Sequence, residues 1–144
     1  MKRADIHKLD RQWATIVKDK AGWKCEFCEV EGVRMEAAHV AGRRYRATRW
    51  GSYRFDPERI AKLRFAVVDN TYDLCGHCLC HNCHQQYDDH GPLEPRIVEK
   101  TVGVDRKERI QQLASVPKAA YQDYDDIKEI LEGFMVTDRL NKEV

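Results

Sequence analysis

The sequence lacks long hydrophobic runs, low-complexity tracts and linkers rich in glycine or serine. A membrane-spanning helix needs about 20 consecutive apolar residues, so we expect no membrane partner. The basic start at residues 1–5 has no apolar segment after it, so we expect no secretory signal and a cytoplasmic location. A chain of 144 residues with no linker is predicted to form a single domain over 1–144.

The missing export signal also bears on the six cysteines. Disulfides persist mainly in oxidising compartments, so cysteines in close pairs are predicted to be metal ligands. A disulfide framework is the alternative interpretation.

The cysteines form three Cys-x-x-Cys pairs: Cys25/Cys28, Cys75/Cys78 and Cys80/Cys83. Such a turn places two thiolates on one side of a tight loop, and two turns together complete the tetrahedral Cys₄ shell that Zn²⁺ prefers. The spacing therefore predicts a zinc site. It leaves open which of the two later pairs completes it.

The net charge is only +1, but the positive charges are unevenly distributed. The segment from Gly42 to Phe55 holds no acidic residue and five arginines: Arg43, Arg44, Arg46, Arg49 and Arg54. Tyr45 and Trp50 lie among them and could stack against bases. This pattern predicts an exposed basic loop that binds DNA through its phosphates. An ordinary solvated loop is the alternative.

Hydrophobic spacing and breaker residues predict the other elements. Ile6, Leu9, Trp13, Ile16 and Val17 predict an amphipathic helix over residues 5–20. Residues 34–40 are β-like. Further predictions are a helix from Pro57 to about residue 64, a strand at 65–68, a helix beginning at His84 that is broken at Gly91-Pro92, and two helices at about 104–114 and 122–134.

Three segments resemble the HNH nuclease family, which has the ββα-metal fold. They are Cys25-Glu26-Phe27-Cys28, Met35-Glu36-Ala37-Ala38-His39-Val40 and Leu79-Cys80-His81-Asn82-Cys83-His84-Gln85-Gln86-Tyr87-Asp88. The arginine segment after His39 is similar to HNH proteins of bacteriophages and prophages, which would place the protein in a bacterial or phage-infected host cell. The resemblance implies an α+β fold, with a zinc-stabilised core at about 12–90 flanked by N- and C-terminal helices. Residues 91–144 would form the C-terminal helical extension.

The resemblance also implies a role for each site residue. Cys25, Cys28, Cys80 and Cys83 would hold a structural Zn²⁺. His39 would be the general base that takes a proton from water, a role that suits the near-neutral pKa of an imidazole. His84 would bind a catalytic divalent ion, Mg²⁺ or Mn²⁺. Asn70 would be the central asparagine of the motif.

The sequence departs from the family pattern at two points. Many members have Asp or His directly before the general base as a metal ligand, and here that residue is Ala38. Glu36, Asp69 and Asn70 are candidates to replace it. The second departure is the doubled cysteine run, because Asn70 fits the pattern with Cys75/Cys78 whereas His84 fits it with Cys80/Cys83. We favour Cys80/Cys83. The unused pair could be free thiols, or it could form a second zinc site with His77, His81 or His90.

The sequence thus predicts a metal-dependent endonuclease that hydrolyses DNA phosphodiester bonds. Because Ala38 cannot bind a metal, a non-catalytic, zinc-stabilised nucleic-acid-binding module is the alternative. A thiol redox protein using Cys75 and Cys78 would need a thioredoxin-like βαβ context, which the sequence does not have.

Overall fold

The computed structural model describes residues 2–42, 46–50 and 74–114, together with 124, 125, 127, 128, 131 and 132. Within them the elements are α1 (Arg3–Lys20), β1 (Met35–His39), α2 (Arg46–Arg49), β2 (Gly76–Cys80), α4 (His81–Asp88), α5 (Glu94–Ile97), the π-helix η1 (Val98–Val102) and α6 (Val104–Ala114). The fold is a mixture of helices with a small antiparallel sheet, which confirms the predicted α+β class.

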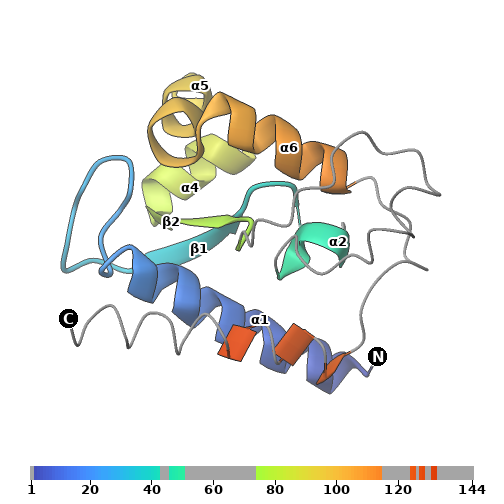
Figure 1. The fold of residues 1–144 in the computed structure, drawn as a ribbon. Coiled ribbons are helices and arrows are strands. Elements are labelled where there is room, and N and C mark those ends of the chain that lie inside the picture. Colours follow the sequence, from blue (N-terminus) through green and yellow to red (C-terminus); the bar gives the residue numbers. More distant parts are fainter. Residues whose placement is uncertain are drawn as a thin grey trace, which may run out of the picture.

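The two strands are antiparallel, and their register runs from Met35 opposite Cys80 to His39 opposite Gly76. Helix α1 packs against one side of this sheet and α4 against the other (Figure 1). The continuous helix formed by α5 and η1 and then α6 follow beyond α4. The sheet is therefore the central layer. His39 lies at the end of β1, and Cys80 lies at the end of β2 where α4 begins.

Helix α1 confirms the predicted amphipathic pattern. Leu9, Trp13, Ile16 and Val17 are all buried, and they recur at the spacing that places them on one helix face. The helix ends before Gly22, whose φ of 66° is a conformation that a residue without a side chain adopts without strain. This end directs the chain toward the first cysteine pair.

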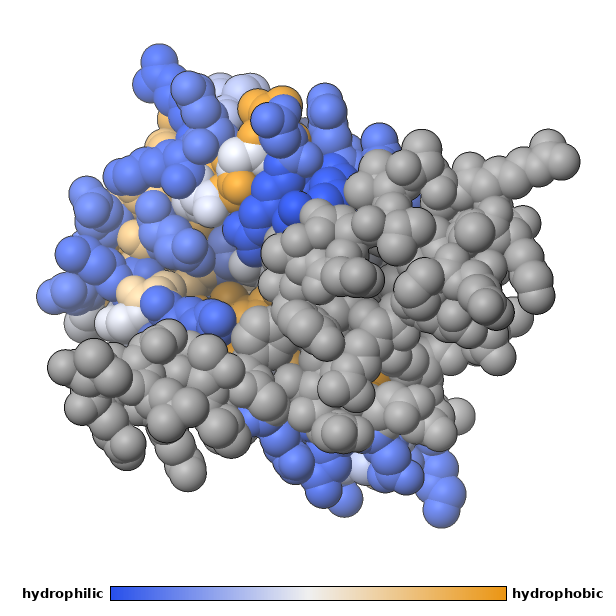
Figure 2. Space-filling model, in the orientation of Figure 1, coloured by the Kyte–Doolittle hydropathy of each residue, from blue (hydrophilic) through white to orange (hydrophobic). Residues whose placement is uncertain are grey.

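The main core joins α1 to the sheet and to residues near the C-terminus. Leu79 of β2 and Leu131 are fully buried in it. Tyr124 and Ile127 pack against the same cluster, so the described C-terminal residues lie along α1 (Figure 1). The described part of the face in Figure 2 is largely hydrophilic, with a few apolar residues showing between charged ones.

The segment from 42 to 55 differs from the predicted exposed loop where the structure describes it. Residues Arg46–Arg49 form the short helix α2, and Thr48 and Trp50 are buried, with exposed fractions of 1% and 3%. The reason is a partner on α1, because the Asp10 carboxylate accepts hydrogen bonds from both Arg49 and Trp50. The prediction of an exposed arm is wrong for this part of the segment.

Two other elements differ from the sequence prediction. The strand that pairs with β1 is formed by the cysteine run itself, and α4 begins at His81 rather than His84. Helix α5 was not predicted, because Gly91-Pro92 indicates a break. The helix begins just after it, and Pro95 occupies the first turn, where its fixed φ suits a helix. The helix predicted at 57–64 and the strand at 65–68 lie outside the described residues.

Helix α6 spans Val104–Ala114, as predicted. No helix in the described part of the chain is long and apolar enough to cross a membrane.

Candidate metal centre and adjoining cleft

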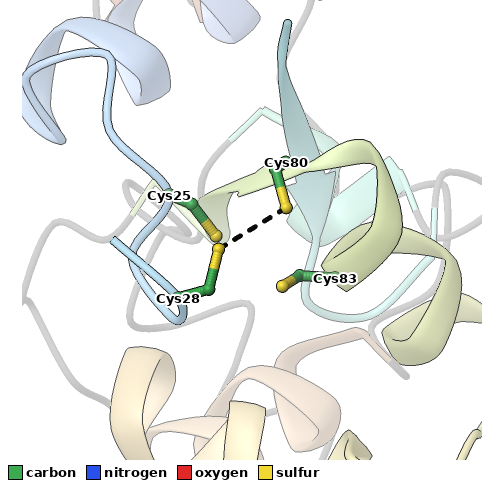
Figure 3. Close-up of side chains that lie close together, drawn as sticks. All are labelled: Cys25, Cys28, Cys80 and Cys83. Atoms are coloured by element: carbon green, nitrogen blue, oxygen red, sulfur yellow. Dashed lines mark hydrogen bonds between the residues drawn. The ribbon is translucent and has the colours of Figure 1, made fainter. Parts of the chain in front are cut away.

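Four cysteine sulfurs converge between the loop after α1 and the junction of β2 with α4 (Figure 3). The Sγ atoms of Cys25, Cys28, Cys80 and Cys83 all lie within 4.8 Å of one another. The distance between the Sγ atoms of Cys28 and Cys80 is 3.7 Å. A tetrahedral zinc with Zn–S bonds of about 2.3 Å separates its sulfurs by about 3.8 Å, whereas a disulfide bond is about 2.05 Å long. The four cysteines therefore have the separation of metal ligands and can hold a zinc ion.

Glu26, inside the first cysteine pair, docks this loop on β2. Its backbone N–H donates to the carbonyl of Cys78 at 2.9 Å, and its carboxylate accepts the backbone N–H of Cys78. Burial raises the pKa of this carboxyl group. Because the loop is bonded to the backbone of β2, Cys25 and Cys28 are held next to Cys80, where that strand ends.

Backbone hydrogen bonds also shape the loop. The N–H of Glu29 donates to the Cys25 carbonyl at 2.9 Å, and Glu29 has a φ of 66° that closes the turn. Burial opposes ionisation of Cys25, but backbone N–H groups of Cys80, Cys28 and Phe27 point at its sulfur and lower the pKa of the thiol to about 7. This loop therefore favours a thiolate at Cys25, the form that binds metal.

The other cysteine pair lies elsewhere. Cys75 and Cys78 are fully buried and belong to two different core clusters. Burial, and then the charge of Glu26, raise the pKa of the Cys78 thiol to about 11. In the described residues the Cys₄ group is the one set of three or more His, Cys, Asp or Glu side chains close enough together to share a metal, so His77, His81 and His90 build no second zinc site there.

A cleft of about 950 Å³ is lined by both His39 and His84, and His84 directly follows Cys83 of the Cys₄ group. His39 is the last residue of β1, and His84 lies on α4, which follows β2 directly. Asp10 and Trp13 of α1 and Lys107 of α6 form other parts of the wall. The two histidines predicted to act together are thus brought to one cleft from elements far apart in the sequence.

His39 packs flat against an aromatic ring. Its imidazole is stacked on the indole of Trp13, with 4.1 Å between ring centroids and 14° between planes. The Asp10 carboxylate also lines the cleft. Burial raises the pKa of Asp10, but hydrogen bonds from Arg49 and Trp50 outweigh it, so the net effect is a lowered pKa and an ionised carboxylate near neutral pH. A positive charge on His39 also lowers the pKa of that carboxyl group.

His84 has a carboxylate at each ring nitrogen. Oε1 of Glu36 lies 2.9 Å from Nδ1, and Oδ2 of Asp88 lies 3.0 Å from Nε2. Burial disfavours the charged form of Glu36, but hydrogen bonds from His84 and His81 outweigh it and lower the pKa of the carboxyl group. An ionised Glu36 can only accept, so Nδ1 of His84 carries the hydrogen and Nε2 points toward Asp88 on the cleft wall.

Ala38, the residue that replaces the expected ligand, is fully buried opposite His77. Of the candidates for its replacement, Glu36 lies at His84, while Asp69 and Asn70 lie outside the described residues. Asp88 is the carboxylate on the cleft wall that contacts His84, and the sequence prediction missed it.

The arginine segment is described only in part. Arg43, Arg44, Tyr45 and the side chain of Arg46 lie outside the described residues. Arg49 forms an ion pair with Asp10 at 2.7 Å, and the ring of Trp50 is buried. In this conformation Trp50 is a core residue, whereas stacking on DNA bases would require an exposed ring.

Lys107 is the lysine on the described cleft wall. Its Nζ lies 3.4 Å from Oε1 of Glu94 and 5.5 Å from the centroid of the Tyr87 ring. Glu94 also accepts a contact of 2.9 Å from Nδ1 of His90. This side of the cleft therefore carries a cation held in place by a carboxylate and an aromatic face.

The chain was compared with protein-family models, with curated proteins and with solved structures. No match was found in any of the three comparisons. The geometry described above therefore carries the functional argument.

The residues that sequence reasoning missed are Trp13, Asp10, Asp88 and Lys107. Asp88 had a local signal, because it follows His84 by four residues on a helix, which places both on one face. The other three had none, since their role depends on how α1 and α6 pack on the sheet.

Proposed function

We propose that the protein is a zinc-stabilised, metal-dependent endonuclease of HNH type that hydrolyses DNA phosphodiester bonds. The observation that carries this proposal is that His39 and His84 line one cleft, and that His84 directly follows Cys83 of the Cys₄ group. The Cys₄ group is built from the loop after α1, the end of β2 and α4, so a zinc bound there would tie the three elements together. The motif resemblance suggests the reaction, and the cleft shared by the two histidines supports the proposal.

In this proposal His39 is the general base. An imidazole can take a proton from water near neutral pH. His39 suits the role because its ring lies on the cleft wall at the end of a strand that is hydrogen-bonded to β2 and backed by α1. The water would attack a phosphorus atom held in the cleft.

His84 and Asp88 are proposed to hold a divalent ion, Mg²⁺ or Mn²⁺. Their nearest nitrogen and oxygen atoms are 3.0 Å apart, which fits two adjacent ligands of an octahedral ion with bonds of about 2.1 Å. When bound, such an ion stabilises negative charge on the phosphate and on the leaving 3′ oxygen. Glu36 would fix the imidazole from behind, as carboxylates commonly do for metal-bound histidines.

The second candidate is a zinc-stabilised nucleic-acid-binding module without cleavage activity. The observation in its favour is Ala38, which is fully buried and offers no ligand. The Asp88 carboxylate beside His84 argues against it, because that residue supplies a second ligand from the helix instead of the strand.

A plasmid assay separates the two candidates. Zinc-loaded protein would be incubated with supercoiled DNA and Mg²⁺ or Mn²⁺, beside the variants His39→Ala and His84→Ala. We expect nicked or linear DNA from the wild type alone. The exposed His7 provides a matched control, His7→Ala, which we expect to cleave normally. DNA binding without cleavage by the wild type would favour the binding module, and equal cleavage by His39→Ala would exclude His39 as the base.

A further inference from the structure

Three segments distant in the sequence meet at His39. Trp13 comes from α1, His39 ends β1, and Gly76 begins β2 directly opposite His39 in the strand register. The Trp13 and His39 rings are stacked, with 4.1 Å between their centroids and 14° between their planes. One face of the imidazole is thus covered by a second flat ring.

The Trp13 indole is itself fixed in place. Its Nε1 donates a hydrogen bond of 2.7 Å to the carbonyl oxygen of Leu74, and its side chain is only 2% exposed. The indole also occupies the space that a side chain at position 76 would fill. A Cβ atom on Gly76 would overlap Cζ2 of Trp13, so this strand position must be glycine for the ring to lie where it does.

We propose that Trp13 is a positioning residue that fixes the plane of the His39 imidazole against the cleft. This inference rests on the proposed function and adds to it a residue outside the HNH-like segments. A general base acts only when its nitrogen is aligned with the water, and a displacement of about 1 Å can lower a rate by about 100-fold. A stacked indole prevents the imidazole from turning about its Cβ–Cγ bond. It also places an aromatic face against the imidazolium that forms when the base takes its proton.

A purely structural role for Trp13 makes different predictions. Leu9, Ile16 and Val17 fill the same helix face, and a leucine at position 13 would keep that face apolar. It would not provide a flat ring beside His39. The positioning role therefore requires an aromatic ring at position 13, whereas core packing requires only apolar volume.

The kinetic test uses zinc-loaded, full-length protein at a temperature at which every variant is folded. The variants are Trp13→Leu, Trp13→Phe and, as a matched control, Trp23→Leu at an exposed tryptophan. We expect Trp13→Leu to lower kcat for plasmid cleavage by about 10- to 100-fold with little change in KM. Trp13→Phe, which keeps a ring, and Trp23→Leu are expected to retain most of the activity.

Three kinetic results would overturn the inference. They are an unchanged kcat in Trp13→Leu, a change in KM alone, and an equal loss of kcat in Trp13→Phe and Trp13→Leu. Gly76→Ala offers a second route if Trp13→Leu does not fold. Because the added methyl displaces the indole without removing it, we expect this variant to lose kcat as well, and a wild-type kcat would count against Trp13.

Proton NMR tests the ring placement without any reference to cleavage. An indole stacked on an imidazole shields the ring C–H protons, so the His39 resonances, identified by their loss in His39→Gln, are expected upfield. They should move downfield in Trp13→Leu and stay shielded in Trp13→Phe. Unchanged His39 resonances in Trp13→Leu would overturn the inference whether or not DNA is cleaved. A wild type that shows the shielding but cleaves no DNA would instead overturn the proposed function.

Discussion

The Glu36 carboxylate lies 2.9 Å from Nδ1 of His84 and so links β1 to α4 at the imidazole proposed to hold the divalent ion. Because the carboxylate is ionised and can only accept, the Nδ1 atom that faces it carries a hydrogen. The other nitrogen then faces Asp88 and the cleft. Glu36 thus orients His84 from the side opposite the proposed ion.

Replacing the Glu36 carboxylate is expected to weaken binding of the divalent ion and so to reduce cleavage. Partners behind a metal-bound histidine typically contribute 10- to 100-fold in affinity or activity, so we expect Glu36→Gln to raise the Mn²⁺ concentration for half-maximal cleavage by about 10-fold or more. A titration of plasmid cleavage against Mn²⁺ measures this. Glu31→Gln, at an exposed acid in the preceding loop, is the control. An unchanged Mn²⁺ dependence in Glu36→Gln would show that Glu36 does not act on the ion.

The two cysteine pairs are expected to respond differently to substitution. Cys83→Ser removes a sulfur of the Cys₄ group, so we expect loss of zinc and a lower unfolding temperature, since zinc binding contributes to folding free energy. Cys78→Ser changes a buried cysteine outside this group and should keep its zinc. Native mass spectrometry measures both, with one zinc per chain expected for the wild type. Zinc retained by Cys83→Ser and lost by Cys78→Ser would show that Cys75 and Cys78, rather than Cys80 and Cys83, complete the zinc site.

The cysteine ligands were predictable from sequence because Cys-x-x-Cys is a local signal, and the histidine after Cys83 selected one of two pairs. The strand that carries Cys80 was not predicted. Gly76, His77 and two cysteines lack the β-branched and aromatic residues typical of strands, and this segment becomes a strand only because β1 pairs with it. Spacing thus identified the cysteines that lie close enough to hold a metal without identifying the element that carries Cys80.

For the residues of the cleft, the sequence predicted the elements but not which side chains meet. The helical pattern correctly predicted that Trp13 is buried. A period of 3.6 residues specifies the face of a helix and not the side chain that it meets, so the stack on His39 follows only from the packing of α1 on the sheet. Trp50 shows the same limit. A tryptophan among arginines indicates a surface loop, and its burial follows only from its hydrogen bond to the half-buried Asp10 on α1.

Lys107 is expected to contribute to substrate binding more than to the chemical step, if the cleft receives a DNA phosphate as proposed. Its ammonium group lies on the cleft wall, held by Glu94 and the Tyr87 ring. We expect Lys107→Ala to raise KM several-fold and to reduce the slope of log affinity against log salt by about 1, the effect of one lost phosphate contact. Lys128→Ala, at an exposed position, is the control. An unchanged salt slope would mean that Lys107 meets no phosphate.

His77 is expected to make the folded protein sensitive to acid. Thr101 donates its hydroxyl hydrogen to the Ile97 carbonyl, so its oxygen accepts from Nδ1 of His77 at 2.8 Å. Burial, and then the positive charge of Arg106, lower the pKa of His77 from 6.5 to about 3. Between these values the unfolded chain binds a proton that the folded protein does not. The stabilisation is therefore complete above pH 6.5 and is lost as the pH falls toward 3.

The variant His77→Asn tests this contribution, because its amide can still donate to Thr101 but does not titrate. Each proton taken up on unfolding lowers the free energy of unfolding by about 1.4 kcal/mol per pH unit. We therefore expect the wild type to lose stability more steeply than His77→Asn between pH 6 and about 4, a range to be covered by urea unfolding at fixed zinc concentration. Zinc loss at acid pH affects both proteins alike, so the difference between the two slopes isolates His77. Parallel slopes would mean that His77 takes up its proton equally well in the folded protein.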